Sequence, residues 1–180
     1  MKQKSSALRR YSLFLILFAA NLILLFTAPE IGQSAFRLTA ANLTEMLSIL
    51  PPIFLLLGLM DVWIPRETMM KYMGRDAGLR GGLLAFTMGS AAAGPLYAAF
   101  PVSGMLLKKG VTLSNVFIFI GAWSTTKIPM LLFEASSLGW KFTAIRLLCS
   151  IAGILMISFL LEKTTSENER KRLYKRAQDL

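Results

Sequence analysis

The chain has 180 residues, of which 54% are hydrophobic and only 17% are charged. An ordinary soluble domain has roughly 25% charged residues, so this balance favours lipid as the solvent. The net charge is +10, but the basic residues lie at the ends of the chain and between apolar runs. That distribution is typical of membrane topology signals and argues against a nucleic-acid partner.

Histidine is absent, and Cys149 is the one cysteine. These two facts exclude an intrachain disulfide, the common zinc sites and any Ser-His-Asp triad, because each needs thiolates or an imidazole. The composition therefore predicts no metal and no cofactor.

The first predicted span covers residues 11–28 and follows Lys2, Lys4, Arg9 and Arg10. At about 1.5 Å per residue, an apolar helix of this length covers about 27 Å, close to the thickness of the bilayer core. A signal peptide has the same order of charges but a shorter apolar region, so a retained anchor is favoured.

The second predicted span covers residues 43–64, and the Pro51-Pro52 pair near its centre predicts a kink. Residues 65–80 are polar and rich in glycine and arginine, which predicts a loop with a short interfacial helix around Met69–Met73.

Two longer apolar segments are interrupted. Residues 81–107 contain Gly94-Pro95 and Pro101, which predicts two short helices with a break, arranged as a re-entrant hairpin. Residues 113–138 are broken around 124–129, which predicts a broken span. A last span is expected at 142–161, followed by a polar tail at 162–180 that forms a short surface helix.

The positive-inside rule places both termini, residues 65–80 and the tail in the cytoplasm, with residues 29–42 outside. The sequence thus predicts one all-α, polytopic membrane domain over 1–180, with four crossings and one hairpin.

Irregular backbone at membrane depth is tolerated only against protein or a water-filled cavity, so the two breaks indicate a solute pathway. The alternative is that they are ordinary kinks absorbed by packing. The predicted pathway residues come from both breaks, from nearby neutral hydrogen-bonding groups and from one acidic residue beyond the second break: Gly94, Pro95, Tyr97, Ser124, Thr125, Thr126, Lys127, Pro129 and Glu134.

Lys127 and Glu134 are seven residues apart, which on a continuous helix places both on one side and predicts an ion pair or a charge relay. Lys127 could instead extend to an interface. The small residues Ala85, Gly89 and Ala93 recur every four positions, which predicts a helix-packing face within the chain or across a dimer.

Two enzyme readings have little support. Ser124 and Lys127 match the Ser-x-x-Lys pattern of serine acyl-enzymes, but the partner motifs Ser-Asp-Asn and Lys-Thr-Gly are missing. The glycines of residues 74–78 lack the Lys-Ser/Thr ending and the preceding strand of a phosphate-binding loop, so ATP binding is not predicted.

Three stretches resemble a known family: GSAAAGPLYAAFPV at 89–102, LLKKG at 106–110 and GAWSTTKIP at 121–129. They are similar to the large bacterial family of predicted permeases that includes the ArsP-type efflux permeases for trivalent organoarsenicals. The resemblance covers roughly residues 43–161. Many members of this family are about twice as long and have two related halves, so the resemblance implies a half-length member that needs a second copy or a half-length relative.

Arsenical-exporting members carry cysteines in the segment that corresponds to residues 91–100, where a thiolate holds trivalent arsenic. Here that segment contains no sulfur. The sequence and the resemblance together predict a permease subunit of the bacterial inner membrane, surrounded by lipid and moving an unidentified small solute or ion. The rival hypothesis is a membrane scaffold or regulatory subunit that does not transport.

Overall fold

A computed structural model describes residues 11–92 and 94–179. The basic N-terminal residues Lys2, Lys4, Arg9 and Arg10 and the packing residue Ala93 lie outside this range. The chain forms two compact units, Met1–Pro51 and Pro52–Leu180. Their boundary falls between the two prolines at which the sequence predicts a kink, within a helix that is continuous in secondary structure.

The first unit is a helical hairpin made of α2 (Ser12–Thr27) and the first part of α3 (Pro29–Trp63). Ala28 links the two helices. Gly32 makes the tight return feasible, because a Cβ atom there would lie 2.7 Å from the backbone nitrogen of Leu25. Farther along, Phe18 and Phe36 form an edge-to-face pair with centroids 6.2 Å apart.

Helix α3 begins at Pro29, well before the predicted start of the second span at residue 43. Residues 29–42, expected as a lightly charged stretch outside the span, are therefore helical. The local reason is favourable helix chemistry at the start: a proline in the first position and Glu30 in the first turn, near the positive end of the helix.

The second unit consists of the rest of α3, a short polar region and a set of apolar helices. The short helix expected around Met69–Met73 is α4 (Arg66–Met73), whose Met69 and Met73 are buried. The remaining elements, in chain order, are η1 (Arg75–Ala77), α5 (Gly78–Ala91), η2 (Leu96–Ala98), α6 (Ala99–Lys108), α7 (Leu113–Thr125), α8 (Ile128–Leu138), α9 (Trp140–Thr164) and α10 (Glu167–Gln178).

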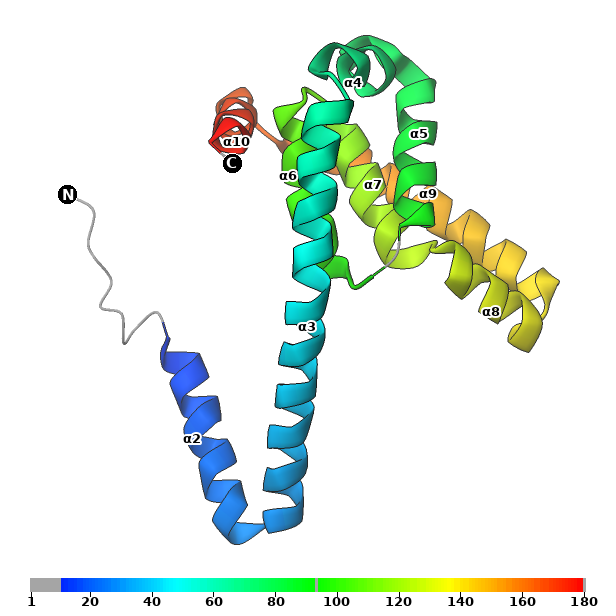
Figure 1. Cartoon of the computed structure of the whole chain (residues 1–180). Helices are drawn as coiled ribbons and strands as arrows, with labels where there is room; N and C mark the ends of the chain where they lie inside the picture. Colours follow the sequence, from blue (N-terminus) through cyan, green and yellow to red (C-terminus); the bar gives the residue numbers. More distant parts are fainter. Residues whose placement is uncertain (1–10, 93, 180) are drawn as a thin grey trace. The chain divides into compact units, whose positions relative to one another are not determined.

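Helix α7 is the centre of the second unit and packs against α5, α6 and α9. In Figure 1, α5 runs away from α4, and after the break α6 returns in the opposite direction. The core residues Phe119, Leu106 and Val111 are fully buried around α7.

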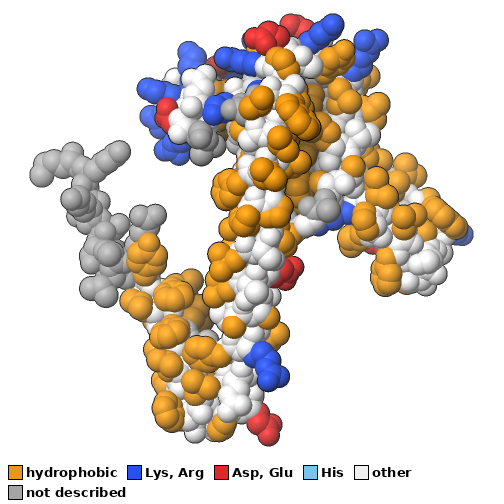
Figure 2. All heavy atoms as spheres, in the orientation of Figure 1, with side chains coloured by type: hydrophobic (Ala, Val, Ile, Leu, Met, Phe, Trp, Pro, Cys, Tyr) orange, Lys and Arg blue, Asp and Glu red, His pale blue; other side chains and the backbone are white. Residues whose placement is uncertain are grey.

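The predicted all-α fold is confirmed, since the described ranges contain helices and turns but no strand. Within the described residues, three stretches are long and apolar enough to cross a membrane: Pro29–Met60, Leu113–Leu138 and Trp140–Thr164. In the second unit, Figure 2 shows hydrophobic side chains over α8, whereas lysines and arginines gather near α4 and α10. This distribution suits a protein whose apolar helices contact lipid.

Candidate transport site at the two helix breaks

The first break follows α5 and centres on Gly94. This glycine has a φ of +101°, a conformation that side chains with a Cβ atom rarely adopt. The next residue, Pro95, is extended and has no N–H group to continue a helix. The Gly94 carbonyl consequently points away from any helical partner and accepts two hydrogen bonds from elsewhere, one from the Trp123 indole at 3.2 Å and one from the Lys127 ammonium.

The second break separates α7 from α8. Thr126 closes α7, and Lys127 is extended, with φ −60° and ψ 133°, before α8 begins. Pro129 lies in the first turn of α8, where its missing N–H group costs nothing. Both donors to the Gly94 carbonyl come from this region, so the structure brings the two predicted breaks into direct contact.

Close helix packing holds the breaks together. A Cβ atom on Gly89 would lie 2.4 Å from the Phe119 carbonyl oxygen, and Ala85 on the same face of α5 is completely buried. One residue after Gly89, the Ser90 hydroxyl lies 3.0 Å from the Thr126 hydroxyl, and both side chains are buried. The small face of α5 thus lies against α7 within the chain.

Glu134 bonds with Arg146, not with Lys127. The Arg146 guanidinium lies 2.6 Å from the Glu134 carboxylate and also donates to the Thr125 carbonyl at 2.9 Å. The predicted Lys127–Glu134 pair is wrong because it assumed one continuous helix, whereas Lys127 lies outside α8 in extended backbone. Sequence reasoning missed Arg146, although one arginine inside the apolar stretch 142–161 is itself a signal of function.

The remaining predicted residues lie near the breaks with local hydrogen bonds. The Ser124 and Thr125 hydroxyls both donate to the Gly121 carbonyl of their own helix, at 2.8 and 2.9 Å. Ser124 and Lys127 therefore donate to different acceptors and do not form the pair that a Ser-x-x-Lys enzyme uses. Tyr97 is partly buried against the core.

Two hollows adjoin α7. A pocket of about 210 Å³ beside the second break is lined by residues of α7 and α9, including Ser124, Thr125 and Ser150. Nearer the start of α7, an apolar groove of about 570 Å³ lies between α5, α7 and α9. The first of these places the hydroxyl-bearing side chains of Ser124, Thr125 and Ser150 beside the second break.

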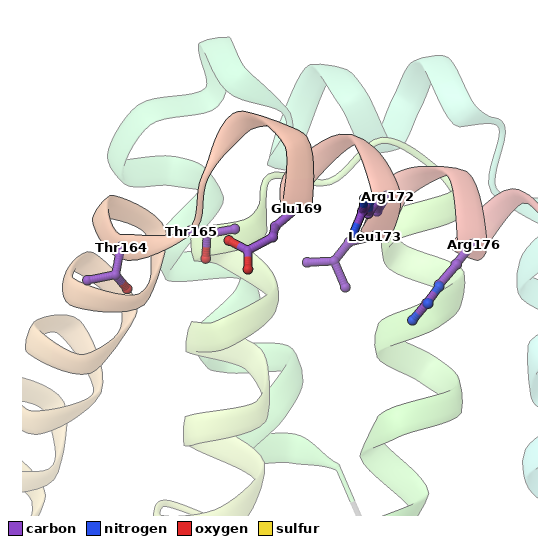
Figure 3. Close-up of a pocket in the computed structure, with 6 residues that line it drawn as sticks. All are labelled: Thr164, Thr165, Glu169, Arg172, Leu173 and Arg176. Atoms are coloured by element: carbon purple, nitrogen blue, oxygen red, sulfur yellow. The ribbon is translucent and has the colours of Figure 1, made fainter. Parts of the chain in front are cut away.

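A third hollow, of about 480 Å³, lies beside α10 and away from the breaks. Figure 3 shows Glu169, Arg172, Leu173 and Arg176 projecting from α10 around it. Hydrogen bonds from the Ser166 backbone and hydroxyl hold the pKa of Glu169 below its ordinary value. These contacts form a capping box that starts α10, so this carboxylate has a structural task.

The arrangement defines a helical membrane protein in which the backbone carbonyl of Gly94, at one break, accepts hydrogen bonds from side chains of Trp123 and Lys127, at the other. Among residues 11–92 and 94–179, no three His, Cys, Asp or Glu side chains cluster to hold a metal ion.

A family model described as a predicted permease, ArsP_1, matches residues 32–180. The chain belongs to this predicted permease family. Neither a curated protein nor a solved structure matches it significantly. Membership of this family points to a membrane transporter.

Proposed function

We propose that the chain is a half-size permease subunit that moves a small solute across the bacterial cell membrane. The observation that carries this proposal is the meeting of the two breaks at Gly94, with Lys127 donating to a carbonyl that has left its helix. Backbone groups freed from helices at membrane depth are costly, and transporters use them to bind solutes and ions.

The half-size assignment rests on how open the site is. Ser124 and Pro129 are exposed, and Lys127 is only partly buried. Helices α8 and α9 also carry exposed apolar side chains such as Phe133 and Leu148. A second copy, or a half-length relative, packed on this side would enclose the breaks and complete a pathway.

The orientation follows from charge. Helix α4 and the tail helix α10 are both rich in lysine and arginine, and we assign them, with the N-terminus, to the cytoplasm. Four crossings and one re-entrant hairpin, α5 to α6, then account for a single membrane domain.

Cysteine accessibility tests the pathway without knowledge of the solute. In a Cys149→Ser background, new cysteines are placed at Ser124 and Thr125, which line the pocket beside the break, and at Phe133 on the exposed apolar face of α8. A charged, membrane-impermeant methanethiosulfonate reagent should modify the first two positions and leave the third unmodified.

Modification of Phe133→Cys alone, or of none of the three, would favour the non-transporting scaffold. Native mass spectrometry in nanodiscs checks the stoichiometry, for which the proposal expects two half-size subunits. With proteoliposomes and a panel of solutes, Lys127→Ala should abolish any flux that the wild type shows.

A further inference from the structure

The charges at the depth of the breaks do not balance. Apart from the lysines that mark the ends of segments, residues 81–161 contain three charged side chains, Lys127, Glu134 and Arg146. Glu134 and Arg146 neutralise each other in an ion pair of 2.6 Å. One positive charge, that of Lys127, is left over.

Within the described part of the second unit, Lys127 is stabilised by a carbonyl dipole and by no counter-charge. Its recorded hydrogen bond goes to the neutral Gly94 carbonyl, and no carboxylate in the described part of the second unit forms an ion pair with it. An ammonium group can donate three hydrogen bonds. Helix α8, eleven residues long, begins directly after Lys127, so the positive end of its dipole adds to the same potential.

We infer that the pathway takes an anionic solute, whose carboxylate, phosphate or similar oxyanion group binds at the Lys127 ammonium. An unbalanced charge at membrane depth is expensive, and a bound anion removes the imbalance. This inference rests on the proposed transport function and specifies the chemical class of its substrate.

Trp123 is a built-in reporter for this position. Its indole N–H and the Lys127 ammonium donate to the same oxygen, so the two groups are no farther apart than two hydrogen-bond lengths. The other tryptophans, Trp63 and Trp140, are exposed, and replacing both with phenylalanine leaves Trp123 as the single fluorophore.

The experiment measures quenching of Trp123 in nanodiscs by iodide, by caesium and by neutral acrylamide at constant ionic strength. Iodide should quench more efficiently than caesium. Lys127→Gln should lower the iodide quenching constant about threefold and leave the acrylamide constant unchanged, because one unit charge near contact distance changes the local ion concentration by this order after salt screening.

Matched variants keep the result interpretable. Lys127→Arg retains the charge and should keep the iodide constant. Glu134→Gln removes a negative charge with little change in shape and should raise the iodide quenching constant. This variant still tests the anion inference if Lys127→Gln fails to fold. Lys141→Gln removes a cation outside the breaks and should change nothing.

The outcomes separate the two proposals. If acrylamide quenches Trp123 but neither Lys127→Gln nor Glu134→Gln changes the iodide quenching constant, the anion inference is overturned. The proposal of an aqueous pathway would still stand. Trp123 is 5% exposed, so the pathway itself is contradicted if none of the three quenchers reaches Trp123 and the cysteines at Ser124 and Thr125 also stay unmodified.

Discussion

Replacing Arg146 with methionine should destabilise the protein strongly. The substitution keeps an unbranched side chain of similar length but leaves the Glu134 carboxylate and the Thr125 carbonyl without the donors they have now. The Glu134 side chain is 9% exposed and that of Arg146 25% exposed, so the pair is mostly shielded from water.

The magnitude follows from this partial burial. Breaking a fully buried ion pair costs about 3 to 5 kcal/mol, whereas an exposed pair is worth about 0 to 1 kcal/mol. With Arg146 still reaching solvent or headgroups, we expect a loss of about 3 kcal/mol in the free energy of unfolding for Arg146→Met. That loss equals a change of about 150-fold in the unfolding equilibrium constant.

The assay is a reversible unfolding titration with sodium dodecyl sulfate in bicelles, followed by tryptophan fluorescence. The double variant Arg146→Met, Glu134→Gln should be more stable than the sum of the single losses implies, because the unpaired carboxylate is then gone. The ion pair does not stabilise this site if the free energy of unfolding of Arg146→Met lies within about 0.5 kcal/mol of the wild-type value. The same conclusion follows if the losses of Arg146→Met and Glu134→Gln simply add in the double variant.

In the same titration, Gly89→Ala should lower the free energy of unfolding by about 2 kcal/mol, because the added methyl forces α5 away from α7. Gly153→Ala is the control: no atom lies within 4 Å of its added methyl, so it should be neutral or mildly stabilising. Ser90→Ala and Thr126→Val should each lower the free energy of unfolding by about 1 kcal/mol. The double variant should lose clearly less than the sum of the two single losses, and full additivity would show that the hydroxyls do not interact. Burial raises the pKa of the Tyr174 phenol above its ordinary 10.0. The contribution of the neutral phenol to the free energy of unfolding is therefore present below pH 10.0 and is lost as the pH rises through the folded-state pKa. An absorbance titration at about 295 nm should therefore show a late phenol transition that Tyr174→Phe removes, and a titration in which Tyr174→Phe removes no late transition would contradict the burial argument.

The positions of the two breaks could be predicted from sequence because their causes are local. Gly94 has to adopt a positive φ, and Pro95 and Pro129 cannot donate a backbone hydrogen bond, whatever the rest of the chain does. The family resemblance rests on the same residues, and the family match confirms it.

The partners across the breaks could not be predicted, because they depend on how separate helices pack. Arg146 reaches Glu134 only after the chain reverses at Gly139, whose φ is +86°. The predicted Lys127–Glu134 pair failed for a related reason: helical spacing applies within α8, and Lys127 lies just before it. Arg146 is the one arginine inside the apolar stretch 142–161, and this signal in the sequence indicates it as an alternative partner for Glu134.

The Gly94 carbonyl has a mechanical consequence. A carbonyl oxygen has two lone pairs, and here the Trp123 indole and the Lys127 ammonium occupy both. Water or a solute that competes for this oxygen must displace one of these two donors, and Lys127 is the residue directly before α8. The Gly94 oxygen therefore couples the two breaks, because a solute that takes the place of Lys127 at the first break also frees the ammonium group of the second.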